Sequence, residues 1–285
     1  MRLPAILAAA ALSLLAPVAY AASEAKHPEH REWSFKGPFG QFDQASLQRG
    51  FQVYQEVCAS CHGLSFLSYR NLGEKGGPFA TYQVRNPETG AVELRIGPEH
   101  GEGKLVNPID SPAIKEIAGA VDITEIDSST GQEATRPGRP ADRFKQPFPN
   151  EAIARAANGG AYPPDLSVIT RARHGGADYI AALLTGYAEP PAGVEVVPGK
   201  YYNPYFPGGW IAMPPQLVED RVVYADGAAA TPEQMAEDVT TFLEWAADPK
   251  ATQRKQMGFG VLGYLLLLTG LLFVAYKQIW SRVKH

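Results

Sequence analysis

The feature that most constrains this chain is the run Cys58-Ala-Ser-Cys61-His62, which contains both cysteines among the 285 residues. Two thiols three positions apart lie on one side of a helical turn, where each can add to one vinyl group of a haem; this is the spacing of a c-type haem attachment site. The imidazole of the next residue then points toward the iron as the proximal ligand. The run therefore predicts one covalently bound haem, and it leaves no cysteine for a structural disulfide.

Other interpretations of the same run are weaker. A structural zinc site needs four ligands, and the sequence has no second pair of cysteines. A thioredoxin-like redox pair belongs near a βαβ pattern, which this sequence lacks. A disulfide across so short a loop would stabilise little, and a chance match is the remaining alternative. An export signal favours haem, because c-type attachment in bacteria is completed outside the cytoplasmic membrane.

Two apolar segments set the expected topology. Residues 1–21 combine a charged start, an apolar run and the small-x-small site Ala19-Tyr20-Ala21, which predicts a cleaved signal peptide. Residues 257–276 form a run of 20 residues without charge, long enough at about 1.5 Å per residue to cross a ~30 Å hydrocarbon core. Basic residues in the tail 277–285 place it in the cytoplasm. The prediction is a single-pass protein of a bacterial cytoplasmic membrane, with residues 22–256 as a periplasmic domain.

The predicted fold is mainly α: a cytochrome c-type helical haem domain with long loop insertions, plus one C-terminal transmembrane helix. Asp43 can cap a first helix, in which Leu47, Phe51, Tyr54 and Cys58 recur at three- and four-residue steps. Thr231-Pro232-Glu233-Gln234 is a capping box that begins a later amphipathic helix. Gly50 would let these two helices cross closely. A net charge of −4 gives no basic excess, so a nucleic-acid partner is not expected.

The segment 73–149 has poor apolar periodicity and is expected to be irregular, apart from one short helix capped by Ser111. Five carboxylates lie between Glu116 and Glu133 with no lysine or arginine among them. Such a run is either a solvated face or a surface that attracts a basic partner. Near the predicted N-terminus of the mature chain, Phe35, Phe39 and Phe42 suggest a strip that packs against the domain.

Three later segments supply candidate site residues. The carbonyl groups of Pro163-Pro164 could accept the Nδ1–H of the proximal histidine and so orient its ring, although a rigid turn explains the prolines equally well. Arg171 and Arg173 could pair with a haem propionate. Met213 lies in a proline-bounded loop where a sixth iron ligand is expected; gap-filling in the core is the alternative. An iron with both axial positions filled carries electrons and has no place for a substrate.

The sequence is similar to the cytochrome c1 family, the haem subunits of ubiquinol–cytochrome c oxidoreductase (cytochrome bc1) complexes. The resemblance covers nearly all of the predicted mature chain. It rests on residues 50–62, on Arg136-Pro-Gly-Arg139, on Asn150 to Ser167, on Arg171 to Tyr179, on Tyr202-Asn-Pro-Tyr-Phe-Pro207, and on the Met213-Pro-Pro loop with the single C-terminal span. The haem motif alone is shared by many cytochromes, whereas the middle matches are more specific.

The resemblance implies that Cys58 and Cys61 hold haem c, with His62 and Met213 as the axial iron ligands. It also implies a haem lining, with two of its members near a propionate (Arg173 and Tyr179). That lining consists of Asn158, Pro163, Pro164, Arg173, Tyr179, Leu183, Leu184 and Phe206. Some bacterial relatives carry an extra disulfide for which this sequence has no cysteines, so stiffening of the Met213 loop must come from its prolines and packing.

By the same resemblance, the chain is an electron-carrying subunit without a catalytic site of its own. Its partners would be cytochrome b and the Rieske iron–sulfur protein in a dimeric complex, with a soluble or membrane-tethered cytochrome c as acceptor. Two alternatives remain at this point: a free-standing membrane-tethered cytochrome c shuttle, and a haem enzyme with an open iron site. Co-purification with b-type haem would argue against the free-standing shuttle. Binding of CO or cyanide to the resting protein would support the haem enzyme.

Overall fold

The computed structural model describes residues 25–97 and 103–282. Its helices are α1 (Gln44–Val53), α2 (Pro112–Gly119), α3 (Glu151–Ala157), α4 (Gly176–Thr185), α5 (Pro232–Ala247) and α6 (Ala251–Trp280), with a π-helical turn η1 (Tyr54–Cys58) and a 3-10 turn η2 (Tyr69–Gly73). The predicted signal peptide and the last three residues of the predicted tail lie outside the described residues.

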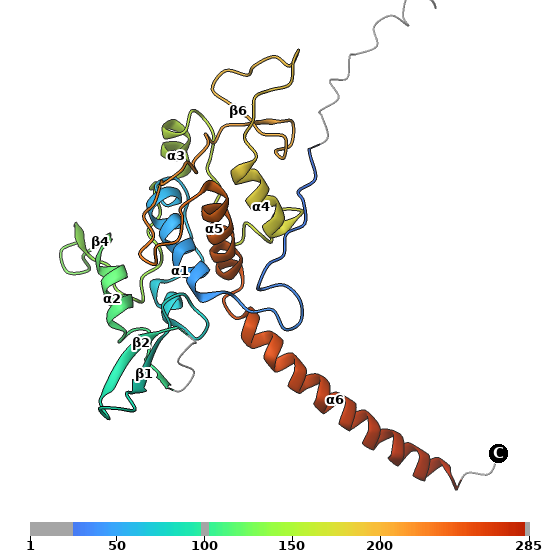
Figure 1. Cartoon of the computed structure of the whole chain (residues 1–285). Helices are drawn as coiled ribbons and strands as arrows, with labels where there is room; N and C mark the ends of the chain where they lie inside the picture. Colours follow the sequence, from blue (N-terminus) through green and yellow to red (C-terminus); the bar gives the residue numbers. More distant parts are fainter. Residues whose placement is uncertain (1–24, 98–102, 283–285) are drawn as a thin grey trace, which may run out of the picture.

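The centre of the domain is the crossing of α1 and α5 (Figure 1). Both helices begin where the sequence predicts: the Asp43 carboxylate accepts the Ser46 amide (2.7 Å), and the Thr231 hydroxyl accepts the Gln234 amide (3.2 Å). These side chains satisfy amides that have no partner within the helix. The apolar faces of both helices then meet in one core, in which Leu47 and Phe242 have no exposed surface.

Gly50 lies at the point where α5 crosses α1, which confirms the prediction from the sequence. A Cβ built on Gly50 would overlap the backbone oxygen of Asp238 and lie 2.7 Å from the Cβ of Phe242. No side chain fits here unless the two helices move apart. The glycine therefore permits the close approach that aligns the first helix, and the haem motif at its end, with the rest of the domain.

We expect Gly50→Ala to lower the free energy of unfolding by about 3 kcal/mol, the upper end of the usual cost of overpacking, because backbone atoms must shift. Chemical unfolding followed by circular dichroism would measure it. Gly119→Ala is the matched control, since its Cβ meets nothing within 4 Å and alanine is the better helix former. Equal stability of the two variants would show that the crossing is not tight.

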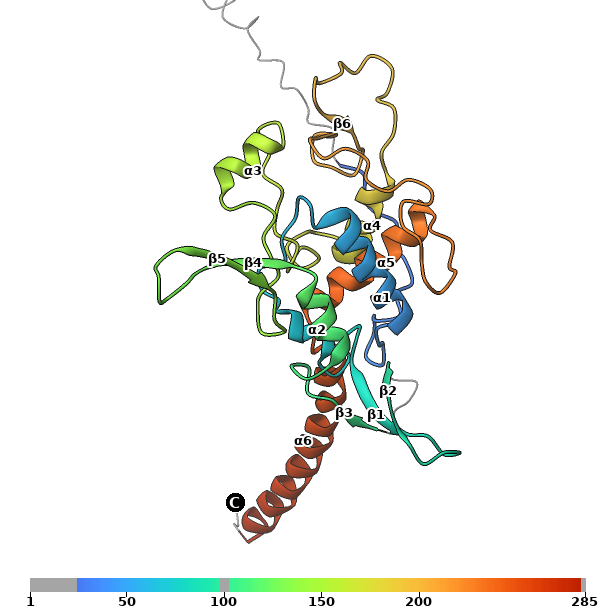
Figure 2. The ribbon, with the colours of Figure 1, turned by 90° about the vertical axis from the view of Figure 1, so that its left-hand side faces the viewer.

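The expectation of an irregular 73–149 segment is wrong. The segment contains a sheet of β2 (Val92–Ile96), β1 (Thr81–Arg85) and β3 (Lys104–Leu105) in that order. It also contains a hairpin of β4 (Asp122–Ile126) and β5 (Glu133–Pro137). Later in the chain, β6 (Tyr201–Tyr202) pairs with β7 (Trp210–Ile211). All of these pairs are antiparallel. The two hairpins project from the helical core (Figure 2). The helices thus form the core, but small sheets supplement the predicted mainly α architecture. The short helix after Ser111 is confirmed.

The acidic run between Glu116 and Glu133 has a cationic neighbour in the structure that the sequence did not indicate. Antiparallel pairing brings Arg136 beside Glu125 (2.9 Å), and the same guanidinium contacts Asp142 (2.7 Å). Hydrogen bonds from Arg136 hold the pKa values of both carboxyl groups below their usual range. Asp127 accepts the Ser129 amide in the hairpin turn (2.7 Å). Part of the acidic run is therefore used to shape the hairpin.

Helix α6 contains the predicted span 257–276 and projects from the domain as a separate rod (Figure 1). Of the phenylalanine strip, Phe35 packs in the domain, but Phe39 does not: it is 78% exposed and stacks on Phe259 of α6, with ring centres 5.0 Å apart. Lys255 donates to the carbonyl oxygens of Phe35 (2.6 Å) and Gly40 (3.2 Å). The N-terminal loop therefore holds the start of this long apolar helix.

Candidate functional site

The Cys58–His62 run follows a widened helical turn. In η1 the Ala59 amide donates to the Tyr54 carbonyl five residues earlier (2.8 Å), and the Cys61 and His62 amides then donate to the Cys58 carbonyl (3.1 and 2.9 Å). Neither thiol is in a disulfide, and both are half-buried. Burial and the neighbouring Cys61 raise the pKa of the Cys58 thiol to about 12. Both thiols are thus positioned on one turn, and the Cys58 thiol is protonated at pH 7.

The ring of His62 is oriented by the prolines of a distant segment. Its Nδ1 donates a hydrogen bond to the carbonyl oxygen of Pro164 (2.7 Å), which confirms that the Pro163-Pro164 carbonyls can serve this histidine. A carbonyl can only accept, so the proton is on Nδ1 and Nε2 keeps its lone pair. Burial lowers the pKa of His62, partly offset by this hydrogen bond, so the ring is neutral at pH 7. A neutral, oriented imidazole is the form that binds a metal.

Further hydrogen bonds join the two segments on either side of this contact. The Leu166 amide donates to the Gly63 carbonyl (2.9 Å). The Asp165 carboxylate accepts the amides of Ser65 and Ser167 (2.8 Å each), and the Ser167 hydroxyl accepts the Phe66 amide (3.1 Å). The chain after His62 is therefore fixed along the chain after Pro164. Asp165 has this role, although the sequence analysis did not single it out.

A second cluster lies at the end of α4. The side chain of Asn203 is fully buried and donates to the Leu183 carbonyl (2.8 Å), while its backbone carbonyl accepts the Phe206 amide (3.0 Å). Leu183 and Leu184, two predicted lining residues in the last turn of α4, are half-buried, and so is Phe206. Asn203 thus brings the loop that carries Phe206 to the end of α4.

Met213 is held by hydrogen bonds and a short sheet. The Tyr187 hydroxyl donates to the Met213 carbonyl (2.9 Å). Directly before it, β6 and β7 pair Tyr201 with Ile211 and Tyr202 with Trp210. Met213 itself is half-buried. These contacts stiffen the loop without a disulfide. Sequence reasoning missed Tyr187, because a tyrosine in a proline-rich loop carries no local signal of such a bond.

The two arginines of the 171–173 run differ in environment. Arg171 forms an ion pair with Glu244 (2.7 Å). This contact anchors the loop on α5. Arg173 is exposed, and among the described residues its guanidinium donates only to the neighbouring Ala172 carbonyl (3.1 Å). Tyr179 packs partly against the core. Asn158, at the end of α3, turns its amide back to Ala154 (2.7 Å). Of the two arginines, Arg173 is the one left available to a ligand.

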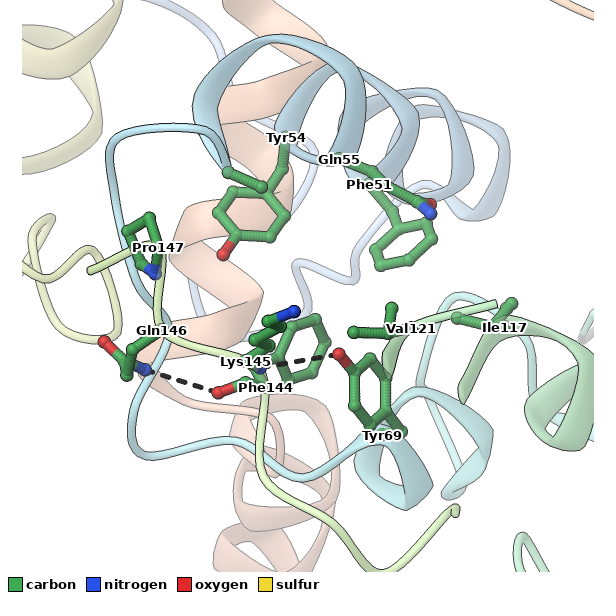
Figure 3. A pocket seen from close by; sticks show the side chains of 11 residues that line it. Phe51, Tyr54, Gln55, Tyr69, Ile117, Val121, Phe144, Lys145, Gln146 and Pro147 are labelled. Atoms are coloured by element: carbon green, nitrogen blue, oxygen red, sulfur yellow. Dashed lines mark hydrogen bonds between the residues drawn. The ribbon is translucent and has the colours of Figure 1, made fainter. Parts of the chain in front are cut away.

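A hollow of about 240 Å³ lies beside η1, between Tyr54, Tyr69 and the segment 144–147 (Figure 3). Its walls are mostly apolar, and the Tyr69 hydroxyl accepts the Lys145 amide at 3.4 Å. None of the predicted haem-lining residues is part of its wall. The hollow adjoins the Cys58–His62 run through Ala59, but neither His62 nor Pro164 is part of its wall.

The donor set suits a metal that arrives with ligands of its own. In the part of the chain that the structure describes, no three side chains of histidine, cysteine, aspartate or glutamate come together as a metal cluster. One oriented imidazole, two adjacent thiols and half-buried apolar side chains remain. This combination fits a haem, whose porphyrin supplies four iron ligands and whose faces need apolar cover.

The helical domain and this site define a cytochrome-like protein with one apolar helix long enough to cross a membrane, and comparisons with known proteins agree. Residues 33–283 match the model of the Cytochrome C1 family. The chain is 43% identical over 268 residues to "Cytochrome c1 1, heme protein, mitochondrial" of Arabidopsis thaliana, covering 92% of this chain and 76% of that protein. It is 41% identical over 271 residues to "Cytochrome c1" of Rhodospirillum rubrum, covering 90% and 88%.

A third relative is longer than this chain. "Cytochrome b/c1" of Bradyrhizobium diazoefficiens is 43% identical over 273 residues, which cover 89% of this chain but only 36% of that protein. Since the family model and these relatives extend over most of its length, the chain belongs to the Cytochrome C1 family.

Proposed function

We propose that this chain is the electron-carrying haem subunit of a cytochrome bc1 complex. It would bind one haem c covalently through Cys58 and Cys61, with His62 and Met213 as axial iron ligands. The observation that carries the proposal is the hydrogen bond from His62 Nδ1 to Pro164 O, which leaves Nε2 of a neutral ring free for iron. The haem would supply the one-electron chemistry, and the chain would position it, fill both axial positions and exclude substrate.

The electron would come from the Rieske iron–sulfur protein and pass to a soluble or tethered cytochrome c. Cytochrome b would be the membrane partner, in a dimeric complex. Support comes from the family and from one relative, which is named "Cytochrome b-c1 complex catalytic subunit, mitochondrial". The domain would lie in the periplasm after removal of residues 1–21, with the tail 277–285 in the cytoplasm. Co-purification with b-type haem after mild solubilisation separates this role from that of a free-standing tethered shuttle.

Covalent attachment is tested directly. We expect the purified chain to retain haem stain at its own mass on a denaturing gel, because thioether bonds survive denaturation. The variant Cys58→Ser/Cys61→Ser should lose that stain. Complete extraction of haem from the wild-type chain into acidified acetone would contradict the attachment.

The surroundings of the two arginines lead to a second test. Arg173→Gln should lower the reduction potential, because a guanidinium near a haem disfavours the additional positive charge of the oxidised iron. Arg171→Gln should instead lower stability, because it leaves the mostly buried carboxylate of Glu244 without its partner. Redox titration and thermal unfolding of both variants measure the two effects. A reversed pattern would assign the propionate to Arg171.

A further inference from the structure

A second hollow, of about 340 Å³, lies where the N-terminal loop, the start of α4 and the junction of α5 with α6 meet. Its wall is unusual in composition for a surface hollow, because four cationic side chains from three separate segments contribute to it. They are accompanied by one carboxylate, that of Glu244. The cations are Lys36, Arg171, Arg254 and Lys255.

The hollow lies at the level where a membrane surface would be. Lys255 precedes the first residue of the uncharged run, Met257, by two positions, which corresponds to about 3 Å along a helix axis. Directly beside it, the exposed ring of Phe39 stacks on Phe259, inside that run. The N-terminal loop and the start of α6 lie side by side in Figure 1. An apolar surface therefore continues from the rim of the hollow down the membrane helix.

The charges in and around the hollow leave one positive charge in excess. Three of the cations are paired: Lys36 with Asp178 (2.9 Å), Arg171 with Glu244 (2.7 Å), and Arg254 with Asp248. Lys255 makes no ion pair among the described residues and donates to two backbone carbonyls instead. Its charge is thus held in place by neutral groups, and an anion could balance it.

One buried side-chain donor in the wall of the hollow has no hydrogen-bond partner among the described residues. The Gly176 amide, at the start of α4, is already used, because it donates to the Arg173 carbonyl (3.0 Å). Thr170 also lines the hollow; it is only 3% exposed, and its hydroxyl has no hydrogen-bond partner among the described residues. A buried hydroxyl without a partner destabilises the folded chain. A bound acceptor would remove that destabilisation.

We propose that this hollow binds the phosphate of an anionic phospholipid, with an acyl chain lying along Phe39 and Phe259. The excess charge of Lys255 and the Thr170 hydroxyl would serve the phosphate. The lipid is the committed source of that phosphate, because the apolar surface of α6 begins at the rim. Such a lipid would fill the corner between the domain and its membrane anchor and so fix the angle between them.

The test uses the full chain in a neutral detergent and follows its unfolding midpoint during titration with phosphatidylglycerol. Phosphatidylcholine, with no net charge, and inorganic phosphate are titrated in parallel. The informative variant is Thr170→Val, which keeps the shape and removes the hydroxyl. Thr240→Val is its matched control, because Thr240 is also fully buried with an unpartnered hydroxyl but is no part of this hollow.

Phosphatidylglycerol should raise the midpoint of the wild-type chain and of Thr240→Val alike. Thr170→Val should need about tenfold more lipid for half of the effect, since one hydrogen bond to a charged group is lost. Without lipid, Thr170→Val should be as stable as the wild type or more so, which separates weakened binding from misfolding. Lys255→Gln should weaken the response at least as much.

Three results would overturn the proposal. They are no stabilisation by phosphatidylglycerol, equal responses of Thr170→Val and the wild type, and stabilisation by inorganic phosphate at the same concentrations as the lipid. The last would show a site for free phosphate, not for a lipid.

Discussion

Replacing Met213 with leucine is expected to leave the haem attached, lower its reduction potential and open the iron to CO. The thioether favours the reduced iron, and axial ligands set haem potentials over a range of ~0.8 V, so its loss should move the potential further than any other single substitution discussed. The Tyr187 hydroxyl donates to the Met213 carbonyl and so fixes the backbone of this half-buried residue. Redox titration and CO difference spectra measure both effects.

Met235→Leu is the control for Met213→Leu. Met235 lies in α5, has no exposed surface and packs in the main core. Its replacement should cost less than about 1.5 kcal/mol of stability and leave potential and CO binding unchanged. If Met235→Leu opened the iron and Met213→Leu did not, the assignment of the sixth ligand would be wrong.

Asp238→Ala should lower the free energy of unfolding by about 3 kcal/mol, the lower end of the cost of breaking a buried ion pair, because Arg49 loses its buried carboxylate partner and keeps only the more exposed Asp226 (2.8 Å). The Asp238 side chain has no exposed surface. Arg49 donates to both of its oxygens (2.8 and 3.0 Å), and the Ser46 hydroxyl to one of them (2.7 Å). The carboxylate thus joins α5 to α1 with charged hydrogen bonds on the side where the two helices cross. Chemical unfolding of the full chain would measure the loss.

Two further variants distinguish the loss of the Arg49–Asp238 ion pair from general effects of mutating α5 on stability. Glu237 is the next residue, is exposed, and lies in the same helix; Glu237→Ala should change stability by no more than about 0.5 kcal/mol. The double variant Arg49→Met/Asp238→Leu should recover most of the lost stability, since apolar residues of similar size often replace a buried ion pair without loss. A double variant as unstable as Asp238→Ala would show that the carboxylate acts through more than Arg49.

The helical core was predictable because its signals are local. Asp43 and Thr231 cap their helices, apolar residues recur at helical spacing, and Gly50 marks the crossing. The β1–β2 hairpin also carried a signal that was missed. Val92, Leu94 and Ile96 alternate with polar residues between two glycines, a strand pattern; all three are exposed, which shows that alternation alone does not tell which face is covered.

The supporting contacts of the site could not be read from the sequence. The bond from His62 to Pro164 was expected only as one use of the prolines, since any free carbonyl could serve. Tyr187 and Asn203 act on backbone carbonyls far along the chain. Such a bond depends on the path of the loops. Its acceptor is a backbone carbonyl, which every residue has, so the sequence gives no signal for it.

The widened turn η1 makes the length of its segment a constraint in itself. An α-helix advances by about 100° per residue, so the additional residue taken up between Tyr54 and Ala59 sets the rotational phase of the two thiols relative to the face of α1 that meets α5. Deleting one residue there would restore a regular helix and turn Cys58 and His62 by about 100°, away from Pro164. Cys58 and His62 could therefore both be retained and the site still be lost, because the number of residues in this short segment sets their orientation.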